Sequence, residues 1–321
     1  MTLTWVVGSG GLLGSAVRHA SARTFEATPI PWGDASDTSV ALSWNLTRFV
    51  HQAGQDEWSI VWAAGRATVG TPRPAVDAEV RTLRAFAGTL QAHAPAGRGA
   101  FFLASSAGGV YAGSEDPPFT ESTPPHALSP YGEGKLAQEH AVTTILAETV
   151  PVVIGRLSNL YGPGQDLGKQ QGLVSQLCRA TAMREALTIF VPMDTLRDYL
   201  HARDAAAMIV GLTAAAAQEQ SPGARIRNLA SRRPTSIAEL ARVVLQVARR
   251  PVRIAAGRGA SATHQVRDLR VGSSFSDEAM RVPVTPLPAG VKEVYDHTLQ
   301  LLRRLATPDS RRAPALSGRD G

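Results

Sequence analysis

The sequence predicts an α/β protein built on a doubly wound parallel sheet, with a smaller α/β unit in its C-terminal part. Two observations carry this prediction. Short, largely apolar runs at 3–7, 59–64, 100–104 and 152–157 alternate with segments of helical periodicity. The runs are apolar on both faces, which is typical of parallel strands covered by helices on both sides.

The predicted elements follow from these two periods. The strand at 3–7 ends in glycines and leads into a helix at 12–22. Prolines at 29 and 31 make residues 28–32 at most a short, irregular or edge strand, and residues 46–53 form a short amphipathic segment. Apolar residues at three- and four-residue spacing predict a helix over 75–93, and a further helix is expected over 131–148. In the second half we expect helices over 172–183, 204–218, 236–249 and 291–305, and a strand over 187–190.

Composition excludes several classes of protein. The chain has 321 residues and a net charge of +6, but its arginines are scattered and aromatic residues make up only 6%, so a nucleic-acid partner is not expected. A single cysteine, Cys178, excludes an intramolecular disulfide and a cysteine-based metal cluster, and we expect no metal. No apolar run reaches the roughly 18 residues of a membrane span, and the N-terminus lacks a secretory signal. We therefore expect a soluble cytoplasmic protein without a membrane partner.

A glycine-rich loop, GSGGLLG at residues 8–14, follows the first strand and opens the first helix. Glycines there permit a sharp turn and a close approach of the backbone to a pyrophosphate, and the helix N-terminus offers free N–H groups to phosphates. This context predicts dinucleotide binding. The expected contacts are Gly8, Ser9, Gly10, Gly11, Leu12 and Gly14.

The acid that would bind the adenosine ribose is expected about 20 residues further on. That position is occupied by Pro31 or Trp32, and the nearest acid, Asp34, lies slightly beyond it. NADP is therefore not excluded. We favour NAD because no arginine directly follows the strand.

A tyrosine and a lysine at four-residue spacing predict acid–base chemistry. Tyr131 and Lys135 are four residues apart on one helix face, where a nearby ammonium lowers the pKa of a phenol. The chain has only three lysines, so this pairing is informative. Ser105 and Ser106 end a buried strand, where α/β sheets place ligands, and a hydroxyl there can bond a substrate oxygen.

Six motifs in order make the chain resemble the extended short-chain dehydrogenase/reductases, specifically the NAD-dependent nucleotide-sugar epimerase/dehydratase family that includes UDP-galactose 4-epimerase. The motifs are GxxGxxG at Gly8, Gly11 and Gly14, WAAG at 62–65, SSAGGVY at 105–111, SPYGEGK at 129–135, RLSNLYGPG at 156–164 and RDYLHARD at 197–204. The resemblance implies a Rossmann-type cofactor domain and a nucleotide-sugar substrate.

The resemblance also implies residue roles. Tyr131 would be the general base and acid, Lys135 its partner, and Ser106 the catalytic hydroxyl with Ser105 behind it. Ala63, Ala64 and Gly65 would lie beside the cofactor, as would Asn45 and Leu46, since Asn45 stands near a position where an adenine-contacting Asp is common. Asn159 and Arg197 match positions that contact the diphosphate, although Asn159 could instead cap a turn.

The resemblance implies three further expectations. Residues 1–165 would form the cofactor domain, with part of 195–230 returning to it, and residues 166–305 mainly the substrate-binding subdomain. The polar composition of residues 306–321, with Pro, Ser and Arg, separately predicts a disordered tail. The family usually dimerises, so a homodimer is expected. Residues 107–109 carry no acid, which disfavours a dehydratase. We expect an epimerase; an NADPH-dependent ketosugar reductase and a non-catalytic NAD(P)-binding sensor are the alternatives.

Overall fold

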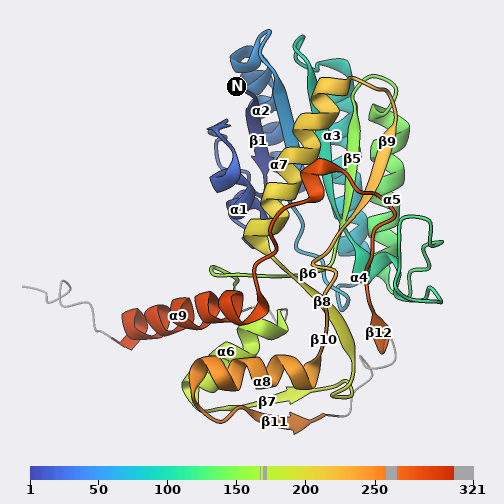
Figure 1. The fold of residues 1–321 in the computed structure, drawn as a ribbon. Helices are drawn as coiled ribbons and strands as arrows, with labels where there is room; N and C mark the ends of the chain where they lie inside the picture. The colour runs from blue at the N-terminus through green and yellow to red at the C-terminus, as the bar shows by residue number, and fades with distance from the viewer. Residues whose placement is uncertain (167, 169–171, 258–265, 307–321) are drawn as a thin grey trace, which may run out of the picture.

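A six-stranded parallel sheet forms the centre of the larger part of the molecule (Figure 1). The structure is a computed structural model, and it describes residues 1–166, 168, 172–257 and 266–306. The strands lie in the order β2-β1-β3-β4-β5-β9, and every neighbouring pair is parallel. Their bounds are β1 Leu3–Val7, β2 Arg23–Thr24, β3 Trp58–Trp62, β4 Gly99–Ser106, β5 Val152–Leu157 and β9 Ala224–Leu229.

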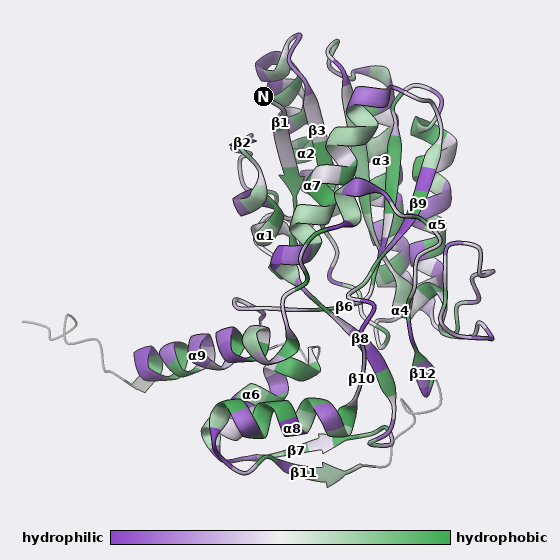
Figure 2. Cartoon of the chain, in the orientation of Figure 1, coloured by the Kyte–Doolittle hydropathy of each residue, from purple (hydrophilic) through white to green (hydrophobic). Residues whose placement is uncertain are grey.

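Helices cover both faces of this sheet, so the predicted doubly wound Rossmann-type fold is confirmed. On one face lie α1 (Leu12–Ala20) and α7 (Ala202–Glu219). On the other lie α2 (Ala35–Ala53), α3 (Arg73–Ala92) and α5 (Pro130–Leu146). Figure 2 shows the central strands coloured largely as apolar, as expected for strands buried between two helical layers.

An aromatic cluster fills the core beneath α2 and α3. The Trp5 ring of β1 meets the rings of Phe25, Phe49 and Phe86 at centroid distances of 5.5, 5.6 and 5.4 Å. All four side chains are almost completely buried. This cluster attaches the two helices to the N-terminal strand that carries the glycine loop.

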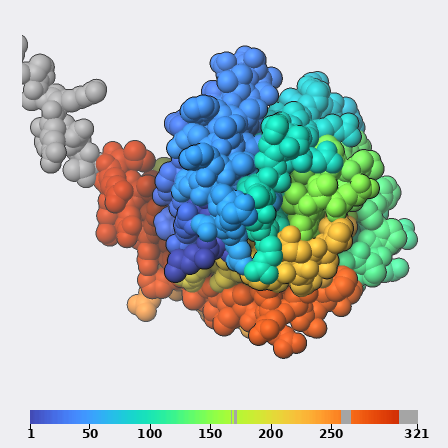
Figure 3. Space-filling view, turned by 90° about the horizontal axis from the view of Figure 1, so that it is seen from above, coloured from blue at the N-terminus to red at the C-terminus, as the bar shows by residue number. Residues whose placement is uncertain are grey.

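A smaller part lies beyond the carboxyl ends of the strands (Figure 1). It contains α6 (Leu173–Met183), α8 (Ile237–Ala248), α9 (Leu287–Ala306), β7 (Ala186–Ile189) and β11 (Arg253–Ala256). These helices share their own apolar core. Figure 3 shows α9, in red, at one side of the molecule.

Short elements lie between the two parts. They are α4 (Ala107–Val110), β6 (Asn159–Tyr161), β8 (Leu196–His201), β10 (Pro234–Ser236) and β12 (Asp268–Leu269), while the 3-10 helix η2 (Glu278–Met280) packs on α7 in the larger part. Strand β8 pairs with β6, β10 and β12. The sequence analysis did not predict β6, β8, β9 or β10 as strands.

Two predicted elements near the N-terminus differ in the structure. Residues 28–32 form no strand; β2 lies earlier, at 23–24, and the amide of Phe25 continues its pairing by donating to the carbonyl of Thr4. The amphipathic segment at 46–53 is the second half of a longer helix, α2, which begins at Ala35 because the Asp34 carboxylate accepts a bond from the amide of Asp37 at 2.9 Å. Of the predicted tail, Ala306 is the last residue of α9, and residues 307–321 lie outside the described part.

Replacing Phe49 with alanine tests whether α2 is held by the aromatic cluster. Because this side chain is fully buried, Phe49→Ala should lower the free energy of unfolding by about 3–5 kcal/mol. Trp44→Ala on the exposed side of the same helix, where the residue is 58% exposed, should change it by less than about 0.5 kcal/mol. Urea unfolding followed by circular dichroism measures both, and equal effects would contradict this packing.

Candidate functional site

The glycine loop lies directly against the end of β3. Gly8 has a φ of +91°, and a Cβ there would come within 2.6 Å of the amide nitrogen of Ala64. A Cβ at Gly14 would collide with the carbonyl oxygen of Gly8. Packing and backbone geometry therefore require glycine at both positions. The loop lies beside Ala63 and Ala64, which the sequence predicts to belong to the same cofactor site.

The middle of the loop is not constrained in this way. A Cβ at Gly10 would have no protein atom within 4 Å, and one at Gly11 would meet the Gly8 carbonyl oxygen at an ordinary 3.6 Å. Gly11 is the N-cap of α1 and has no side chain to bond the first N–H groups of the helix. Ser9 and Leu12 flank this stretch. The arrangement fits a pyrophosphate, which needs a bare backbone and a helix N-terminus.

Three residues predicted to contact the adenosine half of the cofactor, Asp34, Asn45 and Leu46, have other roles in the structure. Asp34 caps α2. The Asn45 amide is fully buried and bonds the backbone of Thr28 at 2.8 and 3.2 Å, and Leu46 is 1% exposed in the core. The structure does not bring Asn45 or Leu46 to a surface. Trp32 is 42% exposed, and its ring centroid lies 6.5 Å from that of Trp62 at the end of β3.

The loop after β3 is held by an acid that the sequence analysis did not assign to the site. Glu79 of α3 accepts bonds from the amides of Arg66 and Ala67 at 2.6 and 2.9 Å. A Cβ at Gly65, whose φ is +152°, would meet the same carboxylate at 3.2 Å. Glu79 therefore shapes the backbone next to the predicted cofactor segment.

Tyr131 and Lys135 lie in the first turns of α5. Ser129 caps this helix by accepting a bond from the amide of Gly132 at 3.3 Å. The Lys135 ammonium donates to the Ala104 carbonyl of β4 and to the Gln138 side chain, both at 3.1 Å, and its nitrogen lies 5.9 Å from the centre of the Tyr131 ring. Both side chains are half-buried. The helix therefore joins the predicted pair to the strand that ends in the serines.

Two glycines let α5 approach α4 closely. A Cβ at Gly132 would collide with the carbonyl oxygen of Gly109, and a Cβ at Gly109 would lie 3.0 Å from Cε1 of Tyr131. Ser106 is the N-cap of α4, and its hydroxyl oxygen accepts a bond from the amide of Gly109 at 3.2 Å. The Tyr131 ring and the Ser106 hydroxyl therefore both lie next to Gly109.

Ser105 faces differently from Ser106, because successive side chains of a strand alternate. It is 4% exposed, and its hydroxyl donates to Glu139 Oε1 at 2.5 Å. Glu139 in turn pairs with Arg156 of β5. The sequence analysis missed Glu139, although its position four residues after Lys135 on one helix face could have indicated it.

The predicted diphosphate residues lie on the neighbouring strands β6 and β8. Arg197 is 9% exposed, its Nη1 donates to the Leu196 carbonyl at 2.8 Å, and burial lowers its pKa. It pairs with no carboxylate in the described part of the chain. Asn159 is exposed and donates to the Asp198 carbonyl at 3.1 Å, a contact between strands rather than a turn cap. Asp268 acts on Arg197 through space without forming an ion pair, and a buried guanidinium that forms no ion pair in the described structure suits an anionic ligand.

The acids of the RDYLHARD motif serve the fold. Asp198 accepts bonds from the amides of Ser231 and Arg233 and from the Ser231 hydroxyl. Asp204 accepts from the amide and hydroxyl of Thr285. Both carboxylates are therefore occupied by loops that join the two parts of the molecule.

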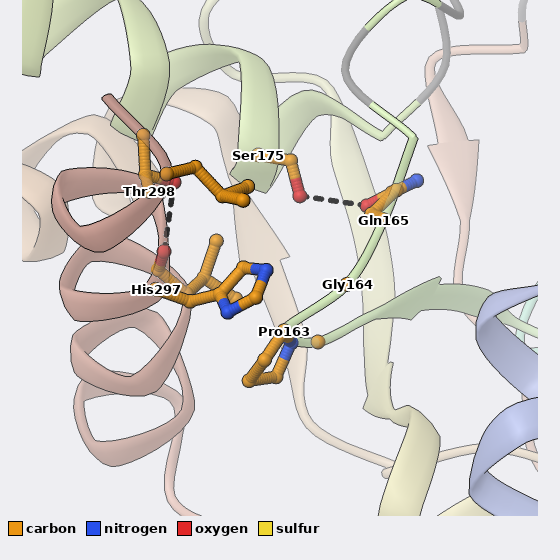
Figure 4. A pocket seen from close by; sticks show the side chains of 9 residues that line it. Pro163, Gly164, Gln165, Ser175, His297 and Thr298 are labelled. Atoms are coloured by element: carbon orange, nitrogen blue, oxygen red, sulfur yellow. Dashed lines mark hydrogen bonds between the residues drawn. The ribbon is translucent and has the colours of Figure 1, made fainter. Parts of the chain in front are cut away.

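Two hollows lie apart from the predicted residues. Figure 4 shows a cavity of about 10 Å³ between the loop after β6 and α9, lined by Gln165, Ser175 and His297 among others. It has room for about one water molecule. A larger hollow of about 370 Å³ lies between α7, the end of β9 and the η2 segment. No predicted site residue lines either of them.

Two general findings complete the description. No helix in the described ranges is long and apolar enough to cross a membrane. Nor do the described residues contain a cluster of three His, Cys, Asp or Glu side chains that could hold a metal ion.

Sequence relatives match parts of the chain. A dTDP-L-rhamnose 4-epimerase from Burkholderia thailandensis is 32% identical over 130 residues, which is 40% of this chain and 35% of that protein. The human dTDP-D-glucose 4,6-dehydratase is 43% identical over 65 residues, or 20% of this chain and 19% of the relative. The aligned segments thus span only about a third and a fifth of these relatives.

Solved structures match almost the whole chain. MoeE5, in complex with UDP-glucuronic acid and NAD, superposes with a TM-score of 0.75 and 22% identity, covering 94% of this chain and all of that one. The Thermotoga maritima UDP-glucose 4-epimerase, with UDP-glucose, gives a TM-score of 0.75 and 18% identity over 94% of this chain and all of that one. At these identities the likeness shows the fold.

The match to a family model is the most extensive sequence comparison. The model of the NAD dependent epimerase/dehydratase family matches residues 5–230, which are 226 of the 321 residues and include the glycine loop, the serine strand, the Tyr–Lys helix and Arg197. The chain therefore belongs to the NAD-dependent epimerase/dehydratase family, and NAD is its cofactor.

Proposed function

We propose that this protein is an NAD-dependent epimerase that acts on a sugar linked to a nucleoside diphosphate. The observation that supports the proposal is that the Tyr131 ring and the Ser106 hydroxyl both lie next to Gly109, while Lys135 bonds the Ala104 carbonyl of the strand that ends in Ser106. The named epimerases among the relatives and similar structures support this reaction. Residues 1–165 and part of 195–230 would bind NAD, and residues 166–305 mainly the sugar nucleotide.

The glycine loop fits the pyrophosphate of NAD, since Gly10 and Gly11 leave the backbone uncovered at the N-terminus of α1. Ala63, Ala64 and Gly65 would form the neighbouring wall. Asp34 caps a helix, so we assign it no ribose contact. When bound, NAD supplies the oxidation and re-reduction of the sugar carbon.

Tyr131 would move the proton of the reaction. Its phenolate oxygen takes the proton from the sugar hydroxyl as the carbonyl forms, and returns it when the hydroxyl is restored. Lys135, whose ammonium nitrogen lies 5.9 Å from the centre of the Tyr131 ring, would be its partner. The Ser106 hydroxyl donates a hydrogen bond to the same sugar oxygen.

Arg197 would bind the diphosphate, because its buried guanidinium has no carboxylate partner in the described structure and its planar donors match phosphate oxygens. Asn159, on the adjacent strand, would add an amide contact. Helix α4 carries only Ala107, Gly108, Gly109 and Val110, with no acid to protonate a leaving hydroxyl, which favours an epimerase over a dehydratase. A homodimer in the cytoplasm stays a prediction.

The loop predicts a specific effect on NAD binding. Gly11→Ala adds a Cβ that the protein itself tolerates, so the variant should fold normally and bind NAD about tenfold or more weakly. The control is Gly88→Ala in α3, where a Cβ would have no protein atom within 4 Å. Isothermal titration with NAD measures both. Equal affinity in Gly11→Ala and wild type would refute this cofactor site.

The role of Tyr131 predicts a loss of turnover without a loss of binding. Tyr131→Phe should lower kcat on a nucleotide sugar by about 10²- to 10⁴-fold, because the proton acceptor is removed. NAD affinity should stay within about twofold of wild type. Tyr295→Phe, which removes a phenol from the core around α9, is the matched control. Wild-type turnover in Tyr131→Phe would disprove the assignment.

A further inference from the structure

Glu139 occupies the third position of the helix face that carries the proposed catalytic pair. Tyr131, Lys135 and Glu139 follow one another at four-residue spacing on α5, so they project from the same side of the helix. Lys135 bonds Ala104 of β4, and Glu139 bonds Ser105, the next residue of that strand. Successive turns of the helix are therefore tied to successive residues of the strand that ends in Ser106.

Glu139 is also tied to the neighbouring strand. Its Oε2 accepts a bond from Arg156 Nη2 at 2.7 Å, and its Oε1 accepts from Arg156 Nε at 3.0 Å and from Ser105 at 2.5 Å. The side chains of Glu139 and Arg156 are 7% and 4% exposed. Two-point pairing of a carboxylate with a guanidinium is directional as well as strong. The pair therefore defines where this turn of α5 lies over β4 and β5.

Arg156 extends the contact beyond the helix. Its Nη1 donates to the Tyr111 hydroxyl at 2.8 Å, directly after α4, and that hydroxyl lies 2.9 Å from the Thr120 carbonyl. Burial opposes the charge on Arg156, but its bonds to Glu139 and Tyr111 outweigh this and raise its pKa. The guanidinium is therefore charged. Through Tyr111 it links Glu139 of α5 to the residue that follows α4 and to the backbone at Thr120.

We infer that Glu139 is a positioning residue, which fixes the position and rotation of α5 that place the Tyr131 ring next to Gly109 and Lys135 against Ala104. This inference rests on the proposed function for its consequence in turnover, but the placement of Tyr131 is measurable without turnover. Ser105, predicted as a hydroxyl behind Ser106, is part of this contact. Glu139 and Arg156 are buried and bond protein groups, so Glu139 would act through the position of the helix.

The test is fluorine NMR of protein labelled with 3-fluorotyrosine, which reports the surroundings of each of the five tyrosines. Tyr131→Phe assigns the Tyr131 resonance. Glu139→Gln keeps the size of the side chain but leaves the buried guanidinium without a negative partner. We expect the Tyr131 resonance to shift or split in Glu139→Gln, and the Tyr161, Tyr199 and Tyr295 resonances to stay unchanged.

The control is Asp277→Asn, which breaks the ion pair of Asp277 with Arg227, away from α5. This variant should not change the fluorine chemical shift of Tyr131. Ser105→Ala keeps the ion pair and should shift Tyr131 less than Glu139→Gln does; it also provides the test if Glu139→Gln does not fold. An unchanged Tyr131 resonance in these variants, with a shift only at Tyr111, would overturn the inference.

Kinetics gives the second readout. Displacement of the proton acceptor should lower kcat of Glu139→Gln by about 10- to 100-fold with KM within about twofold, because misplacement by about 1 Å affects the reacting geometry more than binding. Equal kcat in wild type and Glu139→Gln would overturn the inference. A wild-type protein that turns over no nucleotide sugar would refute the proposed function, while the Tyr131 resonance would still test the placement.

Discussion

The docking of α5 on β4 is the contact on which the site depends. Gly132 permits the helix to touch Gly109, Lys135 bonds a strand carbonyl one turn later, and Glu139 bonds Ser105 and Arg156 after a further turn. A residue with a side chain at Gly132 would push the helix away from α4, and Tyr131 with it. The position of the phenol is therefore set by backbone packing at one end and by a buried ion pair at the other.

The basic excess of the chain has a structural counterpart. Many arginines pair with acids at the surface, as Arg23 does with Asp56 and Arg98 with Glu57. Arg197 differs because it is buried without such a partner in the described structure. Desolvation makes an unpaired guanidinium costly, and an anionic ligand would offset that cost. A phosphorylated small molecule, as proposed above, would be such a ligand.

Local patterns predicted most of the fold and much of the candidate site, because the glycine loop and the Tyr–Lys spacing each depend on nearby residues. The failures arose where distant residues decide. The length of α2 depends on a cap at Asp34 and on burial of Phe49 against Trp5. The tertiary partners of Asn45 and Ser105, which are Thr28 and Glu139, could not be predicted either, and the site roles of Asn45 and Ser105 stay predictions. The spacing of residues along the sequence does not show which distant residues will become their hydrogen-bond partners.

The most direct measurement of the central claim follows sugar and cofactor together. Purified protein with NAD is incubated with a panel of UDP- and dTDP-linked sugars, the anomeric proton signals are recorded by NMR, and absorbance at 340 nm is followed in parallel. The account predicts conversion of one nucleotide sugar into its epimer with no net change at 340 nm. Absorbance that changes in proportion to product, or a panel that stays unconverted while NAD is bound, would contradict it.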